Sequence, residues 1–315
     1  MRYKPFGKTG MDISGVAIGT WGLGGGAWGD VDKNGAIKAI HTMLDLGVNL
    51  IDTAPAYGKG ISEEIVGEAI VGRRDKVFIS TKCGIPITED RTRNRDGSRA
   101  QVIAGCEDSL RRLNIDYIDV LFQHWPDTDT PIQETMEAMN DLKKQGKIRH
   151  IGVSNYSPEQ MEECLKYVDL EVLQPPFSMV DQSAREIMQW ANNHNIANMT
   201  YGSMGAGILS GKIRELIDYG EGNVRGRFYS YFNEPGFSQV MELLKVMDVI
   251  ADAHGVPVSH VAIAWTFQKE YVHTALIGVR TEEHAKENCA AMDFVLSDEE
   301  MAILDKEVDA RFFTK

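Results

Sequence analysis

Hydrophobic positions along the chain follow two alternating patterns. Short apolar runs rich in β-branched residues are typical of buried strands, whereas longer stretches with apolar residues every three or four positions are typical of amphipathic helices. The runs predict eight strands, at residues 16–21, 49–54, 77–83, 117–123, 150–154, 172–175, 198–201 and 274–278. Helical stretches lie between them, for example at residues 37–44 and 136–142.

This alternation of strands and helices, with short connections, predicts parallel strands joined by right-handed crossovers. Eight such units close into an α/β fold of the (β/α)8 TIM barrel type, which is a single domain of roughly 250 residues. Because no Pro- or Ser-rich linker interrupts the alternation, we expect one domain over residues 1–315. An open doubly wound sheet is the alternative architecture.

Three segments fall outside the repeat. Residues 2–14 alternate around a Gly-Lys-Thr-Gly sequence and predict an N-terminal β-hairpin that could close the bottom of the barrel. Residues 297–309 predict an extra C-terminal helix, and residues 211–236 form a long irregular stretch after the seventh strand. Long loops at the C-terminal face of a barrel usually carry function. The expected start signals of four helices are Ser62, Ser98, Ser157 and Thr281.

The composition narrows the range of functions. A net charge of −13 is unfavourable for a nucleic-acid surface, which needs a basic footprint. The longest apolar runs are far shorter than the ~20 residues of a membrane span, and the first residues lack the apolar core of a secretory signal. Four scattered cysteines without a C-x-x-C pair indicate neither a disulfide framework nor a zinc site. We therefore expect a cytoplasmic protein with reduced thiols, no metal, and no membrane or nucleic-acid partner.

A glycine cluster follows the first predicted strand. Residues 22–27 (GLGGGA) formally match the dinucleotide-binding pattern G-x-G-x-x-[GA]. That pattern requires a helix to begin at once, so that its N-terminus holds the pyrophosphate. Here residues 28–32 (WGDVD) precede the helical pattern. We therefore interpret the cluster as a flexible loop over the functional site.

Ionisable side chains stand where predicted strands run out. Asp52, Lys82 and His124 end or follow three strands, and Tyr57 lies in the loop after Asp52. Strand ends converge on one face of a barrel, so we expect these side chains to meet around one cleft. A buried carboxylate alone is costly, which predicts an ion pair between Asp52 and Lys82. A purely structural salt bridge and a structural histidine are the alternatives.

The four side chains together suit proton donation to a carbonyl group that is being reduced. Negative charge develops on the carbonyl oxygen, and it must be stabilised and then protonated. The phenol of tyrosine has an ordinary pKa near ~10. We expect Lys82 to lower this pKa in Tyr57 and Asp52 to keep the lysine charged. His124 would hydrogen-bond the same carbonyl oxygen and orient it.

The motifs around these residues resemble those of the aldo-keto reductases. They are 52-DTAPAYG-58, Lys82, 117-YIDVLFQHWPD-127, 152-GVSNY-156 and 274-TALIGVRTEEHAKEN-288, in order over nearly the entire chain. The resemblance implies a (β/α)8 barrel that uses a nicotinamide cofactor and no metal. It also implies a catalytic tetrad with Tyr57 as the general acid, formed by Asp52, Tyr57, Lys82 and His124.

The same resemblance assigns the cofactor contacts. Ser154, Asn155 and Gln174 would hold the nicotinamide carboxamide, and Tyr201 would stack on the nicotinamide ring. A helix N-terminus attracts phosphate, and there Arg280 and Thr281 would meet the adenosine 2′-phosphate. Along the pyrophosphate the contacts would be Ser203, Met204, Gly207 and Lys212, although Gly-Ser-Met here replaces the Ser-Pro-Leu that is frequent in the family. Glu287 and Asn288 would lie near the adenine. The remaining assigned contacts are Gly278 and His284, at positions where relatives often carry other residues, and Thr20, Trp21 and Asp52.

These matches imply NADP(H) as the preferred cofactor, with NAD(H) as the alternative. The substrate pocket would contain Trp21, Trp28, Tyr57, His124 and Trp125, although the tryptophans could equally be ordinary packing. The sequence leaves the physiological substrate and the oligomeric state open. We expect a reductase of a small aldehyde, ketone or sugar-like carbonyl. The alternatives are a non-catalytic, NADP(H)-binding regulatory barrel like the channel β subunits, and an NAD-linked alcohol or sugar dehydrogenase.

Overall fold

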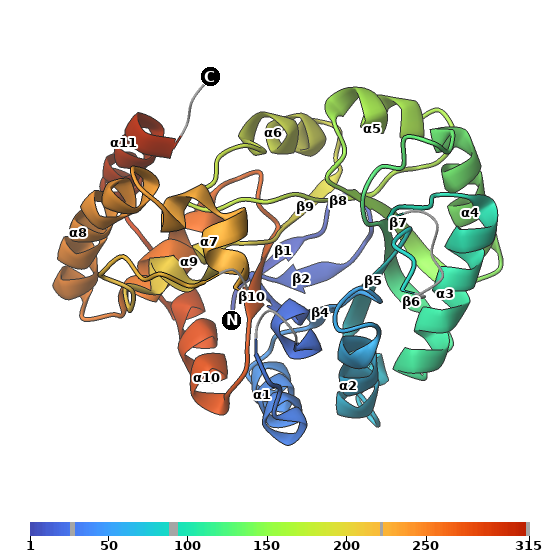
Figure 1. The fold of residues 1–315 in the computed structure, drawn as a ribbon, viewed down its shortest axis with the longest axis horizontal. Helices are drawn as coiled ribbons and strands as arrows, with labels where there is room; N and C mark the ends of the chain where they lie inside the picture. Colours follow the sequence, from blue (N-terminus) through green and yellow to red (C-terminus); the bar gives the residue numbers. More distant parts are fainter. Residues whose placement is uncertain (26–28, 88–93, 221–222, 313–315) are drawn as a thin grey trace.

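The computed structural model describes residues 1–25, 29–87, 94–220 and 223–312. Within them, eight parallel strands form a closed barrel (Figure 1). The strands are β3 (Val16–Gly19), β4 (Leu50–Asp52), β5 (Phe78–Cys83), β6 (Ile118–Gln123), β7 (Ile148–Ser154), β8 (Val172–Gln174), β9 (Ala197–Thr200) and β10 (Thr274–Gly278). The predicted (β/α)8 fold is therefore confirmed, and the open doubly wound sheet is wrong because β10 pairs with β3 and closes the ring.

Helices surround the barrel, as the apolar spacing predicts. They are α1 (Lys33–Asp45), α2 (Ile61–Ala69), α3 (Arg99–Leu113), α4 (Ile132–Lys144), α5 (Pro158–Cys164), α6 (Arg185–Asn193), α9 (Val258–Gln268) and α10 (Glu282–Ala290). Ser98, Ser157 and Thr281 cap their helices through side-chain hydrogen bonds. The expected cap at Ser62 is wrong. Gly60 precedes α2, and the Ser62 hydroxyl is buried inside the fold instead.

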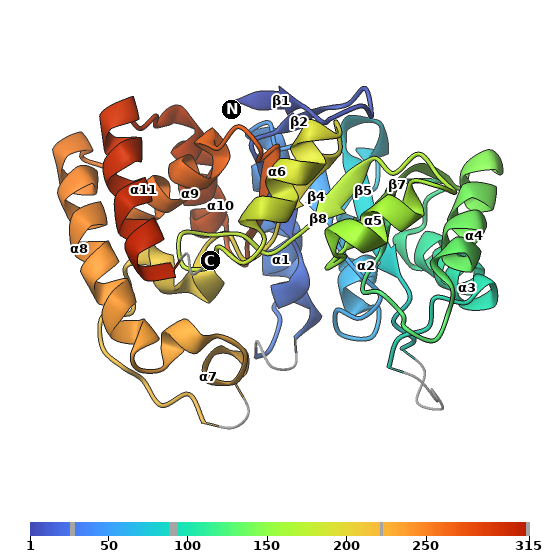
Figure 2. The ribbon, with the colours of Figure 1, turned by 90° about the horizontal axis from the view of Figure 1, so that it is seen from above.

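The N-terminal hairpin covers one end of the barrel. Strands β1 (Tyr3–Pro5) and β2 (Asp12–Ser14) pair antiparallel, as predicted. Phe6 and Ile13 on this hairpin are fully buried and pack with Phe122 and other residues of the barrel interior. Figure 2 shows the hairpin at the edge of the barrel opposite α7 (Val224–Phe228). The hairpin therefore closes the bottom, and function is left to the other face.

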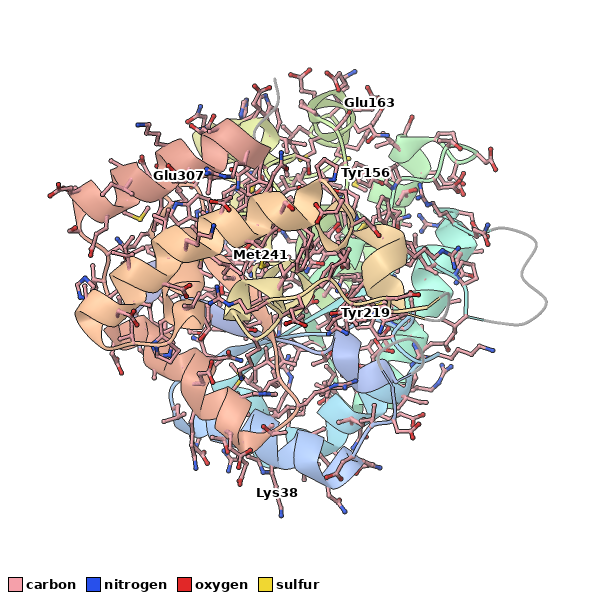
Figure 3. All side chains as sticks on the ribbon, turned by 60° about the vertical axis from the view of Figure 1, so that its left-hand side comes forward. Lys38, Tyr156, Glu163, Tyr219, Met241 and Glu307 are labelled. Carbon is pink, nitrogen blue, oxygen red and sulfur yellow. The ribbon has the colours of Figure 1, made fainter. Side chains whose placement is uncertain are left out.

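The long segment after β9 lies at that other face. It contains the short helices η4 (Gly205–Ser210), α7 (Val224–Phe228) and η5 (Ser230–Phe232) before α8 begins (Gly236–His254). The stretch predicted as irregular is thus interrupted by α7. The predicted extra C-terminal helix is present as α11 (Asp298–Phe312) and lies beside α8 (Figure 3). Within the described residues, no helix has both the length and the apolar character that crossing a membrane requires.

Candidate active site

Asp52 and Lys82 form a buried ion pair at the C-terminal ends of two neighbouring strands. Asp52 is the last residue of β4, and Lys82 lies near the end of β5. The Lys82 Nζ atom is 2.7 Å from Asp52 Oδ2 and donates a second hydrogen bond to the Thr53 carbonyl at 2.8 Å. The two side chains are 1% and 2% exposed. Each therefore compensates the other's loss of hydration.

The second oxygen of Asp52 connects this pair to neighbouring strands. Asp52 Oδ1 accepts from the Ser80 hydroxyl at 2.8 Å and from the Gln174 amide at 2.9 Å. Sequence reasoning did not select Ser80. Side chains two apart on a strand share a face, so its position two residues before Lys82 would have indicated it.

Residues assigned to the nicotinamide continue the same network. The Ser154 hydroxyl donates to the Gln174 carbonyl at 2.8 Å, and the Asn155 amide donates to Ser154 Oγ at 3.0 Å. Asn155 Oδ1 in turn accepts from the Tyr201 hydroxyl at 2.9 Å. Asn155 holds a left-handed backbone (φ 62°), which asparagine tolerates better than most residues. This predicted group is therefore joined to Asp52 through Gln174, whose side chain bonds Asp52 and whose main-chain carbonyl bonds Ser154.

Tyr57 lies among three aromatic and cationic side chains. The Lys82 Nζ atom is 4.8 Å from the centroid of the Tyr57 ring. The His124 ring meets it edge-on at 6.1 Å, and the Trp21 ring lies tilted at 6.4 Å. The four predicted tetrad side chains are thus brought together at one end of the barrel. Trp28, predicted for the same pocket, lies outside the described residues.

The electrostatics of this group differ from the sequence expectation in one respect. Burial raises the pKa of Tyr57 above its ordinary value, and the charge and hydrogen bond of Lys82, which lower that pKa, do not offset burial. The pKa of Lys82 is raised, because Asp52 and Tyr57 outweigh the effect of burial. Burial, Lys82 and Arg95 hold the pKa of His124 well below its usual range. At neutral pH the phenol is therefore protonated, the lysine is charged and the imidazole is neutral.

Gly24, within the glycine cluster, packs closely against the Tyr57 loop. Trp21–Gly24 form a 3₁₀ turn (η1), and α1 begins only at Lys33, which agrees with a loop rather than a dinucleotide-binding turn. A Cβ on Gly24 would lie 2.5 Å from the backbone of Tyr57 and Gly58. Only glycine allows this close approach between the two loops.

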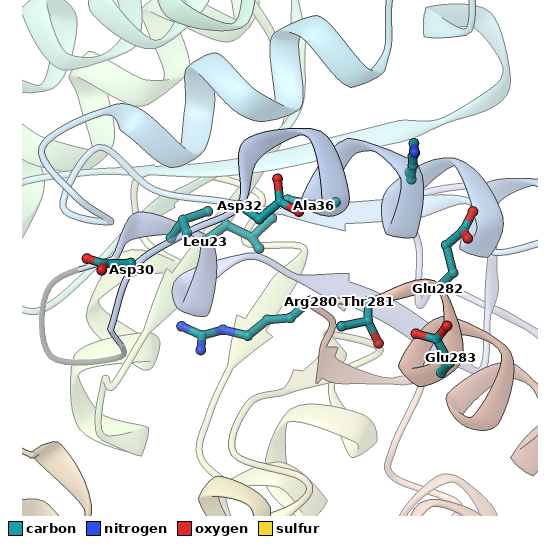
Figure 4. Close-up of a pocket in the computed structure, with 11 residues that line it drawn as sticks. Leu23, Asp30, Asp32, Ala36, Arg280, Thr281, Glu282 and Glu283 are labelled. Atoms are coloured by element: carbon teal, nitrogen blue, oxygen red, sulfur yellow. The ribbon is translucent and has the colours of Figure 1, made fainter.

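A cavity of about 340 Å³ lies between η1, α1 and the start of α10 (Figure 4). Arg280 and Thr281, the residues predicted to bind the 2′-phosphate, line it together with Leu23. The Arg280 Nη2 atom donates to the Gly22 carbonyl at 3.1 Å, and Thr281 caps α10. Four carboxylates also line the cavity, those of Asp30, Asp32, Glu282 and Glu283.

The other predicted cofactor residues differ in accessibility. The side chains of Thr20 and Ser203 are buried and bond within the protein. The Thr20 hydroxyl donates to the Asp52 carbonyl at 2.8 Å, and the Ser203 hydroxyl is hydrogen-bonded to Thr200 Oγ1 at 3.1 Å. Gly207 has a positive φ of 97°, with open space where a Cβ would be. Lys212 is exposed, 3.8 Å from Glu287, and the Asn288 amide donates to the Gly278 carbonyl at 3.4 Å. Met204 packs against the core, and His284 is exposed in the first turn of α10.

The cysteine thiols do not supply a reactive group here. All four cysteines are free and buried, which raises the pKa of the Cys106 thiol, for example, to about 12. Such thiols are inert at neutral pH. Across the described ranges, no group of His, Cys, Asp and Glu side chains is arranged to hold a metal ion.

Comparison with known proteins identifies relatives over most of the chain. The model of the Aldo/keto reductase family matches residues 15–309. Aldo-keto reductase YhdN of Bacillus subtilis (strain 168) is 38% identical over 89% of this chain and 85% of its own. The NADH-specific methylglyoxal reductase of Escherichia coli (strain K12) is 32% identical, with 98% and 99% covered. A probable voltage-gated potassium channel subunit beta of Arabidopsis thaliana is 33% identical, with 94% and 92% covered.

Solved structures agree with this result. A glycerol dehydrogenase from Gluconobacter oxydans superposes with a TM-score of 0.88 at 34% identity, covering 97% of this chain and 94% of its own. An aldo/keto reductase from Klebsiella pneumoniae, solved in complex with NADP and acetate, gives a TM-score of 0.75 at 30% identity, with 96% and 93% covered.

Proposed function

Because this chain belongs to the aldo/keto reductase family of oxidoreductases, we propose that it reduces a small aldehyde, ketone or sugar-like carbonyl with NADP(H). The observation that carries the proposal is the group formed by Tyr57, His124 and the buried Asp52–Lys82 pair. We propose further that residues 1–315 act as one domain in the cytoplasm, where free buried thiols such as these stay reduced.

In this proposal Tyr57 is the general acid. Its raised pKa keeps the phenol protonated at neutral pH, so that a proton is available for the carbonyl oxygen. As the carbonyl carbon is reduced, the phenolic proton moves from Tyr57 to the carbonyl oxygen, and Tyr57 becomes a phenolate. The charge of Lys82, 4.8 Å from the Tyr57 ring centroid, stabilises the phenolate. Neutral His124 donates one N–H to the same oxygen and orients it.

The residues around the tetrad fit a nicotinamide cofactor. The Ser154 hydroxyl donates to the main-chain carbonyl of Gln174 and accepts from the side-chain amide of Asn155, and Asn155 in turn accepts from the Tyr201 hydroxyl, so these groups form one linked set. In the cavity at the start of α10, the Arg280 guanidinium and the helix N-terminus are the groups that would meet an anionic part of the cofactor. When bound, the cofactor supplies the hydride, and the protein supplies position and electrostatic stabilisation.

The preference for NADP(H) rests on Arg280. A guanidinium at a helix N-terminus suits a 2′-phosphate, and the Klebsiella pneumoniae relative was solved with NADP. The carboxylates of the same cavity act against a phosphate, and the Escherichia coli relative is named as NADH-specific. We place NADP(H) first because the Arg280 guanidinium in this cavity can bind a phosphate through charge-assisted hydrogen bonds. NAD(H) is the second candidate.

Two further functions compete with reduction. The Arabidopsis thaliana relative is named as a channel subunit, which favours a regulatory barrel, but here the Asp52–Lys82 pair and Tyr57 form a complete proton-donating group. The glycerol dehydrogenase relative favours alcohol oxidation. Turnover of a panel of carbonyls and alcohols with both cofactors separates these functions.

The decisive experiment removes one hydroxyl. Tyr57→Phe keeps the ring and its contacts with His124 and Trp21, so the fold and cofactor affinity should be unchanged. We expect kcat to fall by ~10²–10⁴-fold, the usual contribution of general acid catalysis. Tyr3→Phe on the hairpin is the matched control, since it also removes one tyrosine hydroxyl, there one that donates to the Gly47 carbonyl away from the site. Near wild-type turnover by Tyr57→Phe would contradict the acid assignment.

A further inference from the structure

Arg95 lies beside the proposed active site and directly precedes two residues that are anchored by hydrogen bonds. It lies between β5 and α3, and the next residue, Asp96, donates its N–H to the Gly84 carbonyl at 2.9 Å. Gly97 donates its N–H to Asp127 Oδ2 at 2.9 Å and accepts from the Thr135 hydroxyl at 2.6 Å. These hydrogen bonds of the two following residues fix the point from which the Arg95 side chain extends.

The guanidinium of Arg95 stacks on the tryptophan that follows the site histidine. Its central carbon is 4.6 Å from the centroid of the Trp125 ring, and Nη1 donates to the Pro126 carbonyl at 3.3 Å. The side chain nevertheless belongs to an exposed residue. Stacking restricts the plane of the guanidinium, so less conformational freedom is lost when its remaining N–H groups bind a ligand.

The positive charge of Arg95 acts on the site itself. After burial and the charge of Lys82, the charge of Arg95 is the third cause that lowers the pKa of His124. The charge of Lys82 is neutralised by the carboxylate of Asp52. Arg95 donates to the Pro126 carbonyl, which is neutral and does not cancel the charge of the guanidinium. Arg95 therefore places a positive charge beside the site, in a chain whose net charge is −13.

We propose that Arg95 recognises an anionic group, a carboxylate or a phosphate, on the carbonyl substrate. The carbonyl would bind at Tyr57 and His124, and the anion would meet the guanidinium stacked on Trp125. A planar guanidinium can bind either oxyanion through two parallel hydrogen bonds. This inference rests on the proposed reductase function, and it narrows the substrate to an aldehyde or ketone with a negatively charged end.

The test compares matched pairs of substrates. Succinic semialdehyde is set against its neutral methyl ester, and glyceraldehyde 3-phosphate against glyceraldehyde, so that one pair probes a carboxylate and the other a phosphate. We expect wild-type kcat/KM to be higher for the charged member of at least one pair, and the preference to weaken at high salt. Arg95→Gln should lose about tenfold to hundredfold in kcat/KM on that member, mainly through KM. Its activity on the neutral member should stay within about twofold.

Two variants serve as controls. Arg99→Gln removes an exposed arginine that pairs with Asp141 on the outer helices, and it should leave kcat/KM unchanged for both members of each pair. Arg95→Lys keeps the charge and should retain part of the preference. Melting temperatures of all variants are measured, because a purely structural role of Arg95 would lower activity on charged and neutral substrates alike.

The failures of the two proposals are distinguishable. Wild-type turnover without any preference for a charged substrate would overturn the role of Arg95 alone, as would an equal loss on both members of a pair in Arg95→Gln. No turnover of any carbonyl by the wild type would overturn the reductase function, and the inference built on it.

Discussion

Replacing Lys82 by methionine tests whether the Asp52–Lys82 pair holds the barrel together as well as serving the chemistry. Methionine has a similar length but no charge, so it would leave the Asp52 carboxylate, only 2% exposed, without its cation. The carboxylate would keep its hydrogen bonds from Ser80 at 2.8 Å and Gln174 at 2.9 Å. Two neutral donors do not replace the cation, and removing one partner of a buried pair costs about 3–5 kcal/mol.

That free energy can be converted into a melting temperature. The entropy of unfolding is about 2.1 cal/mol/K per residue, or about 0.7 kcal/mol/K for 315 residues. A loss of about 3–5 kcal/mol then corresponds to a decrease of about 5–8 °C. Activity should be lost in the same variant, since nothing would stabilise the Tyr57 phenolate.

Calorimetry of three variants separates stability from catalysis. Lys33→Met is the matched control, because Lys33 pairs with Glu68 at the surface, where both side chains are about half exposed, and such pairs contribute at most about 1 kcal/mol. The double variant Asp52→Asn/Lys82→Met removes both charges, so it should regain most of the lost stability but no activity. A Lys82→Met protein that melts within about 1 °C of the wild type would refute the buried pair as a source of stability.

Two further predictions concern the cofactor and acid stability. Arg280→Ala should weaken NADPH binding by roughly tenfold to hundredfold, the equivalent of a charge-assisted hydrogen bond, and leave NADH binding nearly unchanged. Dissociation constants from fluorescence quenching test this, and an equal loss for both cofactors would contradict it. Burial and the charge of Lys4 lower the pKa of His273 to about 4 in the folded protein. In the unfolded chain the imidazole has its ordinary pKa of about 6.5, so as the pH falls it is protonated in the unfolded chain before it is protonated in the folded one. The contribution of neutral His273 to the free energy of unfolding should therefore be fully present above pH ~6.5 and decrease toward pH ~4, by up to about 3 kcal/mol. His273→Asn, which keeps an acceptor for the Asn198 N–H, should flatten this dependence in urea titrations, and an unchanged slope would exclude His273 as its source.

The strands and the hairpin could be predicted from the sequence because their signals are local. Burial on both faces of a parallel strand gives a continuous apolar run, and all eight such runs appear as strands of the barrel. The helix start at Ser62 could not be predicted in this way. A serine before an apolar stretch indicates a cap, but the Ser62 hydroxyl is buried against Thr20 at 2.7 Å, a contact across 42 residues of sequence.

The direction of the Tyr57 pKa shift also needed the structure. Sequence reasoning identified Lys82 as a cation close to the phenol, and its effect on the pKa has the expected sign. What the sequence does not contain is the depth of burial, which acts in the opposite direction and is larger. Desolvation depends on every element packed around a side chain, whereas a charge partner can be inferred from two strand ends.

The Asp52 carboxylate shows how the barrel combines two halves of a site through one residue. Its Oδ2 atom binds Lys82, on the proton-donating side, and its Oδ1 atom binds Gln174, which carries the hydrogen-bonded chain through Ser154 to Tyr201. Gln174 stands 122 residues away in the sequence, on β8, so neither spacing nor periodicity indicates the contact. It exists because closing the barrel brings the ends of β4 and β8 around one axis. The orientation of the proposed carbonyl-binding groups and that of the proposed cofactor-binding groups are therefore linked by the same buried charge.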